Sequence, residues 1–239
     1  MNIPDASAKS ENFQIGDLIL VKNNQFIAFN KPPAIPVQAD LTGDKPLVEL
    51  AEIYCKAPLF LVHRLDRPAS GVVLFAKTKN GLADINRQFH DRQVQKIYLA
   101  IVQQPPPQPE GTLVHFLRKN AKTNLTSVFE KEVAHADRAE LEYRTLRSSD
   151  RYHLLEIELL TGRHHQIRAQ LAAIGCPIKG DVKYGARRGN PDRSIHLHAW
   201  KLNFRHPVTR ERVAIIAPTP DDSLWNFFRD DVPNHPTEG

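Results

Sequence analysis

Short apolar runs and alternating apolar positions, separated by turn residues, recur along most of this chain of 239 residues. Residues 18–29 contain two apolar runs around Asn23 and Asn24, and this pattern predicts a β-hairpin. In residues 94–102 and 153–159, apolar side chains occupy every second position, as they do on the buried face of a strand. A chain with this patterning must be organised around a β-sheet.

Helical spacing is confined to a few isolated stretches between the predicted strands. These stretches are residues 44–56, 80–91 and 164–174, followed by a last helix that Asp221 or Asp222 can cap. Strands and helices do not alternate for long enough to build a doubly wound sheet. The fold class is therefore predicted to be α+β, with a mixed, largely antiparallel central sheet flanked by helices.

The chain length allows one domain of good size. We predict a flexible N-terminal tail over residues 1–17, a single domain over residues 18–231 and a flexible C-terminal tail over residues 232–239. Within the domain, the proline-rich segment 105–109 is the best candidate for a boundary between two lobes.

Charge and cysteine content limit the classes of protein to which this chain can belong. The formal net charge is +5, which is compatible with a polyanionic partner but does not require one. Cys55 and Cys176 lie far apart and are predicted to be reduced side chains rather than a disulfide or metal pair. No secretory signal and no apolar stretch near 18 residues occur, so we expect a soluble cytoplasmic protein, with a monomer as the default.

The first motif with chemical content lies at residues 62–77. Asp66 stands between Arg64 and Arg67, a Pro-Ala-Ser-Gly turn follows, and residues 72–76 read as a buried strand. Asp66 is therefore expected on a loop fixed against the core, with two arginines nearby that favour its ionised form. The alternative is an ion-pair partner or turn residue of no catalytic importance.

A second motif covers residues 161–168, Thr-Gly-Arg-His-His-Gln-Ile-Arg, and is followed by Gly180-Asp181 and Tyr184-Gly185. We predict that Arg163 to Arg168 span the first turn of a helix, where anions are favoured. Two arginines in this segment can hold a carboxylate or a phosphate. A merely solvated basic helix face is the alternative.

The third motif is the strand segment Lys96-Ile97-Tyr98, in which Tyr98 could equally be an ordinary half-buried tyrosine of the sheet. No glycine-rich phosphate loop is present, so a nucleotide cofactor is not expected. The paired histidines, His164 with His165 and His196 with His198, offer too few convergent ligands for a metal, and none is predicted.

Together these three motifs, in this order, resemble the signatures of the RluA family of RNA pseudouridine synthases over about residues 18–217. One departure is Ala69, where the usual form has threonine. The resemblance implies the catalytic fold of that family and the isomerisation of uridines in ribosomal or transfer RNA. It implies no cofactor, because the product is an isomer of the substrate.

Roles for individual residues follow from the resemblance. Asp66 becomes the essential carboxylate, acting either as a nucleophile at C1′ or as a base at C2′. Arg168 pairs with Asp66, and Tyr98 stacks on the extruded uracil and assists proton transfer at C5. Arg64 fills the gap in the RNA, and Ile167 lies beneath the base. The candidate RNA-contacting residues are Lys31, Arg64, Arg67, Lys96, Arg163, His165, Gln166 and Ile167.

Two other functions fit parts of the sequence. A glycosidase also attacks an anomeric carbon, but it usually needs a second carboxylate, and Asp181, the only plausible one, is expected to be structural. A non-catalytic RNA-binding protein of the same fold would use exposed aromatic and basic residues without needing Asp66.

Overall fold

The computed structural model describes residues 14–40 and 42–233. The two predicted tails therefore lie mostly outside the described residues. Ile15–Leu18, at the end of the predicted N-terminal tail, form the short 3-10 helix η1, and Ile15 and Leu18 pack against the core. At the other end, Val232 packs beside α4.

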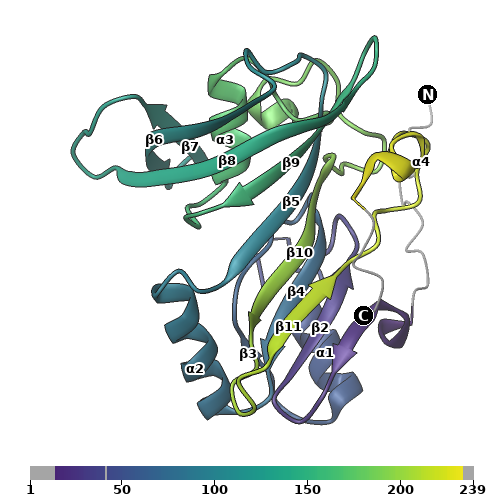
Figure 1. The fold of residues 1–239 in the computed structure, drawn as a ribbon. Coiled ribbons are helices and arrows are strands. Elements are labelled where there is room, and N and C mark those ends of the chain that lie inside the picture. The colour runs from purple at the N-terminus through teal and green to yellow at the C-terminus, as the bar shows by residue number, and fades with distance from the viewer. Residues whose placement is uncertain (1–13, 41, 234–239) are drawn as a thin grey trace.

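An eleven-stranded sheet forms the body of the molecule (Figure 1). Its main path runs in the order β1-β2-β4-β10-β5-β9-β8-β6-β7, with β11 paired to β10 and β3 paired to β4. The strands are β1 Ile19–Lys22, β2 Phe26–Lys31, β3 Phe60–Leu61, β4 Ser70–Ala76, β5 Gln95–Val102, β6 Glu110–Asn120, β7 Leu125–Phe129, β8 Asp137–Ser148, β9 His153–Leu159, β10 Leu197–Arg205 and β11 Arg212–Ile216.

Four α-helices and three short 3-10 helices complete the described part of the chain. Helices α1 and α3 pack on one face of the sheet, whereas α2 and α4 pack on the opposite face. None of the helices in the described ranges is long and apolar enough to cross a membrane. The bounds are α1 Leu47–Cys55, α2 Lys79–His90, α3 Gln166–Ala173, α4 Ser223–Phe227, η1 Ile15–Leu18, η2 Val182–Tyr184 and η3 Arg229–Asp231.

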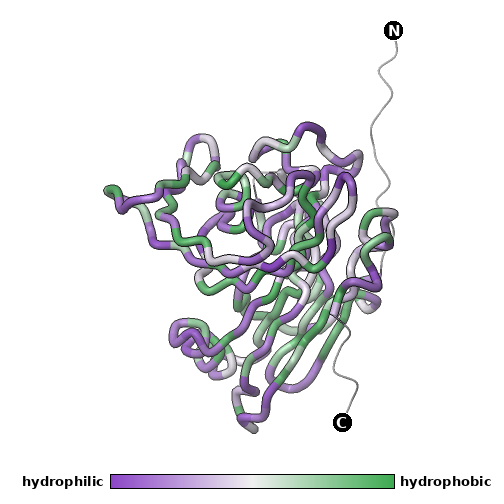
Figure 2. Tube along the Cα trace, turned by 45° about the horizontal axis from the view of Figure 1, so that its top comes forward, coloured by the Kyte–Doolittle hydropathy of each residue, from purple (hydrophilic) through white to green (hydrophobic). Residues whose placement is uncertain are grey.

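Apolar residues concentrate in the strands at the centre of the molecule, and the outer turns are mainly hydrophilic (Figure 2). The central strands are buried on both faces, because alternate side chains enter different hydrophobic clusters. In β5, Tyr98 and Ala100 join the cluster beneath α1 and α3, whereas Leu99 and Ile101 join the cluster beneath α4. Tyr98 therefore faces the same side of the sheet as α3.

All but one of the strand pairs are antiparallel. The exception is the parallel pair of β4 and β10, in which Ala199 lies opposite Gly71. Ala199 also lies opposite Tyr98 in β5. Gly71, Ala199 and Tyr98 thus form one row across β4, β10 and β5. This row connects the start of β4, directly after the Asp66 loop, to Tyr98.

Gly71 makes this row possible. Its backbone has φ +113°, a value that L side chains rarely adopt, and an added Cβ would come within 2.2 Å of the carbonyl oxygen of Ala199. The glycine of the first motif therefore allows β4 and β10 to approach each other closely.

The sheet, the hairpin β1–β2 and the cap of α4 confirm the predicted α+β class and several of its elements. Asp222 caps α4, because its Oδ1 accepts from the amides of Leu224 and Trp225 at 2.8 and 2.9 Å. Segment 105–109 connects β5 and β6, two strands of the same continuous sheet. One expectation is corrected. Helix α3 begins at Gln166, and Arg163 to His165 precede it as a turn.

Candidate active site

Asp66 lies on the loop between β3 and β4, and backbone hydrogen bonds fix this loop. Within the loop, the amide of Ala69 donates to the carbonyl oxygen of Asp66 at 3.1 Å. From outside it, the amide of Ala34 donates to the carbonyl oxygen of Arg67 at 2.9 Å. These contacts set the position of the Asp66 backbone independently of its side chain.

Lys31 anchors the same loop from the interior, and this corrects the prediction that it contacts RNA. Its side chain is completely buried. Nζ donates to the carbonyl oxygens of Pro32, Ile35 and Arg67 at 2.9, 3.0 and 3.1 Å. Burial lowers the pKa of Lys31 to about 7. An amine enclosed by three carbonyl groups has no hydrogen left for a phosphate, so its role is to hold the loop.

Arg168, from α3, holds the carboxylate of Asp66. Nη1 of Arg168 lies 3.0 Å from Oδ2 of Asp66. The rest of the guanidinium faces Asp181, with Nε 2.7 Å from Oδ2 and Nη2 2.8 Å from Oδ1. Although burial acts against it, the hydrogen bonds and charges of the two carboxylates raise the pKa of Arg168 above its ordinary value. Arg168 is thus a fixed cation with one donor directed at Asp66.

His165 approaches the same carboxylate oxygen, with Nε2 3.8 Å from Oδ2 of Asp66. Its Nδ1 lies 2.8 Å from the hydroxyl of Tyr184, which accepts a hydrogen bond from the amide of Thr126 at 2.9 Å. Burial lowers the pKa of His165 to about 3, so the ring is neutral beside Asp66.

The two oxygens of Asp66 therefore differ in their surroundings. Arg168 and His165 both approach Oδ2. No hydrogen bond among the described residues engages Oδ1. The side chain is 27% exposed, which leaves it accessible from the adjacent cavity. Oδ1 is the oxygen available for a reaction.

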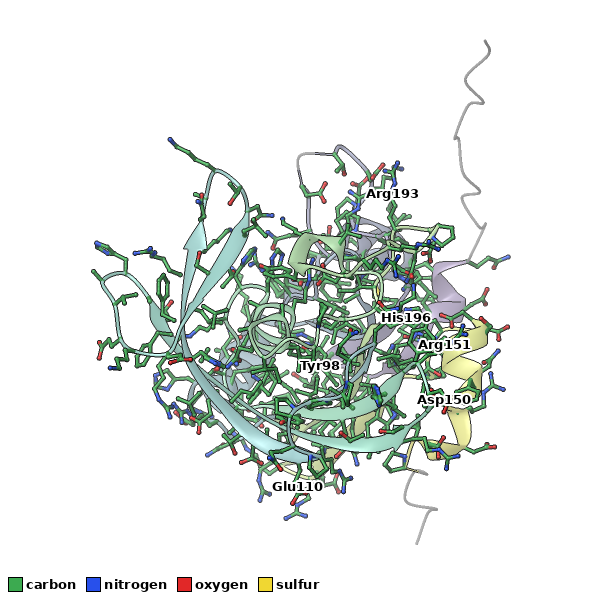
Figure 3. All side chains as sticks on the ribbon, turned by 90° about the horizontal axis from the view of Figure 1, so that it is seen from above. Tyr98, Glu110, Asp150, Arg151, Arg193 and His196 are labelled. Atoms are coloured by element: carbon green, nitrogen blue, oxygen red, sulfur yellow. The ribbon has the colours of Figure 1, made fainter. Side chains whose placement is uncertain are left out.

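A cavity of about 290 Å³ opens beside Asp66. Tyr98, labelled in Figure 3, lies on its wall and is only 8% exposed. Burial and the charge of Asp66 raise the pKa of Tyr98, so its hydroxyl keeps its proton at neutral pH. The apolar part of the wall is formed by Leu65, Phe89, Leu159, Ile167 and Leu197. A cavity with an apolar wall, one tyrosine and one carboxylate suits a flat polar ring.

Other predicted RNA-contacting residues also line this cavity. Lys96 donates from Nζ to the carbonyl oxygen of Thr161 at 3.3 Å, and burial lowers its pKa to about 8. Arg163 lines the rim and donates from Nε to the carbonyl oxygen of Arg138 at 3.2 Å. Arg64 is exposed at the opening. These three side chains bring positive charge to the mouth of the cavity.

The prediction that the Gln166 side chain contacts RNA is contradicted. Gln166 is only 3% exposed. Its Oε1 accepts from the hydroxyl of Thr161 at 2.7 Å and from the amide of Arg163 at 3.0 Å, while Nε2 donates to the carbonyl oxygen of Glu140 at 3.0 Å. Both the oxygen and the nitrogen of the side-chain amide are therefore engaged within the protein, where they tie the turn before α3 to β8.

Arg67, the residue after Asp66, directs its guanidinium away from that carboxylate. It forms ion pairs with Asp40, at 3.2 Å, and with Asp44. The cation that holds Asp66 is therefore Arg168, 102 positions later in the sequence, rather than its neighbour in the first motif.

Asp181 is not available as the acid of a glycosidase. It is 1% exposed, and both of its oxygens accept from Arg168. An inverting or retaining glycosidase needs a second carboxyl group that reaches the substrate. The buried contact instead supports the expectation that Asp181 is structural.

Metal coordination finds no support in the histidine pairs. Among residues 14–40 and 42–233, no group of three or more His, Cys, Asp or Glu side chains is placed to hold a metal ion. His198 is buried between Ser70 Oγ, 2.9 Å from Nδ1, and the carbonyl oxygen of Ala217, 3.1 Å from Nε2.

A larger cavity, of about 780 Å³, lies beside α4. Asp150, Arg151 and His196 line it, and Figure 3 shows these three residues apart from Tyr98.

Two residues of the site were not assigned a role from the sequence. Tyr184 hydrogen-bonds to Nδ1 of His165 and to the amide of Thr126, and the centroid of its ring lies 5.0 Å from the guanidinium carbon of Arg168. The Tyr-Gly pair after the second motif was a visible signal for Tyr184. No pattern in the sequence indicated Thr126, because it comes from β7, a strand without a motif.

Comparison with known proteins gives consistent matches. The family model described as RNA pseudouridylate synthase matches residues 25–173. An RNA pseudouridine synthase of Mycobacterium bovis is 33% identical over 239 residues, covering 93% of this chain and 76% of the relative. The ribosomal large subunit pseudouridine synthase C of Rickettsia prowazekii is 30% identical over 222 residues, covering 90% of this chain and 72% of the relative.

A further relative, an RNA pseudouridine synthase of Mycoplasma pneumoniae, is 31% identical over 202 residues, and the chain spans 65% of its length. Among solved structures, human RNA pseudouridylate synthase domain containing 4 is similar, with a TM-score of 0.72 and 26% identity. That match covers 91% of this chain and 92% of the human chain.

Proposed function

The chain belongs to the RNA pseudouridylate synthase family, and on that premise we propose that it isomerises specific uridines of structured RNA, with Asp66 as the essential carboxylate. The reaction breaks the bond between C1′ and N1 of uridine and forms a bond between C1′ and C5 of the same base. The proton at C5 is lost and N1 gains one, so no cofactor is consumed.

One observation carries the proposal. The carboxylate of Asp66 has one oxygen, Oδ2, facing Arg168 at 3.0 Å, and a second oxygen free beside a cavity that Tyr98 and Ile167 line. An ionised carboxylate with one fixed and one free oxygen is suited to nucleophilic attack at C1′ and to removal of the proton at C2′. Both routes start from the free oxygen.

The target base has to leave its stack before Asp66 can reach the sugar. Extrusion of a base costs a few kcal/mol, and stacking on aromatic side chains offsets part of this cost. We assign Tyr98 to stack on the uracil, and its hydroxyl, which keeps its own proton, to relay the C5 proton rather than to remove it as a phenolate. Ile167 supports the opposite side of the base. Arg64, exposed at the mouth, fills the space that the uridine leaves.

Residues 18–231 are proposed to act as one catalytic domain and as a monomer on ribosomal or transfer RNA. The ribosomal large subunit enzyme among the relatives supports the first of these substrates. Mapping pseudouridines across total RNA from cells with and without the gene would identify the modified positions.

The decisive variant is Asp66→Asn, which keeps the size of the side chain but removes its charge. We expect it to form no detectable pseudouridine from RNA of cells that lack the gene, while it binds that RNA with unchanged affinity. Asp150→Asn, on an exposed turn, serves as the control and should remain fully active. If the Asp66 variant still made pseudouridine, the assignment of the carboxylate would be wrong.

A second outcome addresses the other class of function. A non-catalytic RNA-binding protein of the same fold would produce no pseudouridine even as the unaltered chain, and its binding would not respond to Asp66→Asn.

A further inference from the structure

A second cavity, of about 430 Å³, adjoins the one that contains Tyr98. The two cavities share Arg64, Leu65, Asp66, His164, His165 and Arg168. Its remaining wall is built from segments distant in sequence, namely residues 36–40, the end of β6 with the β6–β7 turn, and η2. Asp66 therefore stands at the junction of two connected spaces, of which only one is needed for the uracil ring.

The charges that line this second cavity do not balance. Its two acids are both engaged, since Asp66 pairs with Arg168 and Asp40 pairs with Arg67. Three further cations also line it: Arg64, Lys119 and Lys183. Within the described ranges, the side chains of these three cations form no hydrogen bond and no ion pair at contact distance, and all three residues are exposed. Their charges are therefore open to an anion from outside the protein.

All three cations act electrostatically on one side chain. His164, on the shared wall, has its pKa lowered to about 4, first by burial and then by the charges of Lys119, Arg64 and Lys183, against the opposing effect of Asp66. The positive charge of the two lysines, which come from β6 and η2, thus converges on the same ring. Asn124, in the β6–β7 turn, adds a side-chain amide to the same wall.

Covalent connectivity identifies the anion. If the uracil occupies the cavity beside Tyr98, its ribose lies at Asp66, and the two phosphodiesters attached to that ribose are only a few bonds away. At least one of them has to leave through the space that also borders Asp66. A phosphodiester carries one negative charge and accepts hydrogen bonds from lysine, which is a point-charge donor well suited to phosphate.

We propose that Lys119 and Lys183 form a phosphodiester-binding subsite that holds the RNA backbone next to the target uridine. The inference rests on the proposed function and deepens it, because it states which part of the substrate the second cavity receives. Arg64, at the border between the two cavities, remains assigned to the gap in the RNA. The lysines position the substrate and take no part in bond breaking.

The test replaces each lysine by glutamine and measures the binding of labelled RNA, taken from cells that lack the gene, over a range of salt concentrations. Neutralising one phosphate contact should make the slope of log K against log salt shallower by about 0.7–0.9. At 0.1 M salt, this corresponds to a loss of affinity of about five- to eightfold per lysine. Lys79→Gln, at the first residue of α2 and outside both cavities, is the matched control and should change neither quantity.

A synthetic RNA that carries a mapped target uridine refines the test. Replacing one flanking phosphodiester by an uncharged methylphosphonate should weaken binding to the unaltered protein, and at one position it should abolish the effect of Lys119→Gln and Lys183→Gln. A partly misfolded variant would bind less RNA in total but would keep the original salt slope, so the slope separates lost contact from lost folding.

The outcomes for the two proposals are distinct. If the unaltered chain forms pseudouridine and both lysine variants keep its affinity and salt slope, the subsite is refuted while the proposed function stands. If the unaltered chain forms none, the proposed function fails, and the salt slopes then report only whether the lysines bind RNA phosphate.

Discussion

Asp181 holds Arg168 through two parallel hydrogen bonds, 2.7 Å to Nε and 2.8 Å to Nη2, so that only Nη1 remains to reach Asp66. The geometry of a paired guanidinium and carboxylate is specific, because both groups are planar. Asp181 therefore determines where Arg168 directs its third nitrogen, although it does not itself contact the cavity.

From this relationship we predict that Asp181→Asn weakens both folding and activity. The amide nitrogen would face a guanidinium that can only donate, and the buried cation would lose a charge partner. Losing one partner of a buried ion pair costs about 3–5 kcal/mol of unfolding free energy, which urea denaturation would measure. Pseudouridine formation should also fall at a temperature where the variant is fully folded. Asp150→Asn, on the β8–β9 turn, is the matched control and should change neither value.

Tyr98 is expected to contribute through its ring and its hydroxyl separately. Tyr98→Phe keeps the ring, so RNA affinity should hold while kcat falls by about 10²–10⁴, the usual contribution of a positioned proton donor or acceptor. Tyr98→Ala should in addition lose about 1–3 kcal/mol of binding from base stacking. Single-turnover kinetics and RNA binding would separate the two effects. A phenylalanine variant with full activity would limit Tyr98 to stacking.

Lys31 should make the stability of the protein depend on pH. Its pKa is about 7 in the folded state and near 10.5 in the unfolded chain, so between these values the unfolded chain binds a proton that the folded protein does not. Stability therefore rises with pH in this window, by up to about 1.4 kcal/mol per pH unit from this group. Urea unfolding at pH 7 and pH 9 should show a larger rise in the unaltered chain than in Lys31→Met, which keeps the smaller contribution of Lys96, whose pKa burial lowers to about 8. An equal rise in both would exclude Lys31 as its source.

Gly71→Ala should destabilise the protein and inactivate it. The new methyl group would meet the backbone of Ala199, 2.2 Å from its oxygen, in the row that also contains Tyr98. Gly175→Ala is a sharp comparison, because Gly175 also has positive φ but nothing lies within 4 Å of its added Cβ. The free energy of unfolding of the control should fall by about 1–2 kcal/mol from backbone strain alone. For Gly71→Ala, overpacking should lower it by about 1–3 kcal/mol more, and urea unfolding would measure both values.

The fold class and the contact between Asp66 and Arg168 followed from the sequence for different reasons. Alternating apolar positions predicted the strands directly, because side chains in a strand point to opposite faces. The pairing of two residues 102 positions apart came from the resemblance of the motifs to a family, since no local pattern specifies it.

The misassigned residues share a physical cause. Lys31 and Gln166 are polar residues, and such residues are ordinarily expected at the surface. Their burial depends on backbone partners from distant segments, such as the carbonyl oxygens of Arg67 and Glu140. Hydrogen bonds of this kind are set by tertiary structure and leave no spacing pattern in the sequence.

The continuous sheet also indicates whether the protein or the RNA changes conformation when they bind. Strands β4 and β5 both pair with β10, so the loop that carries Asp66 and the strand that carries Tyr98 are attached to one hydrogen-bonded scaffold. Such a scaffold has little freedom to close around a ligand. The nucleic acid therefore has to supply most of the distortion, and uridines in loosely stacked loops should be modified faster than uridines held within a duplex.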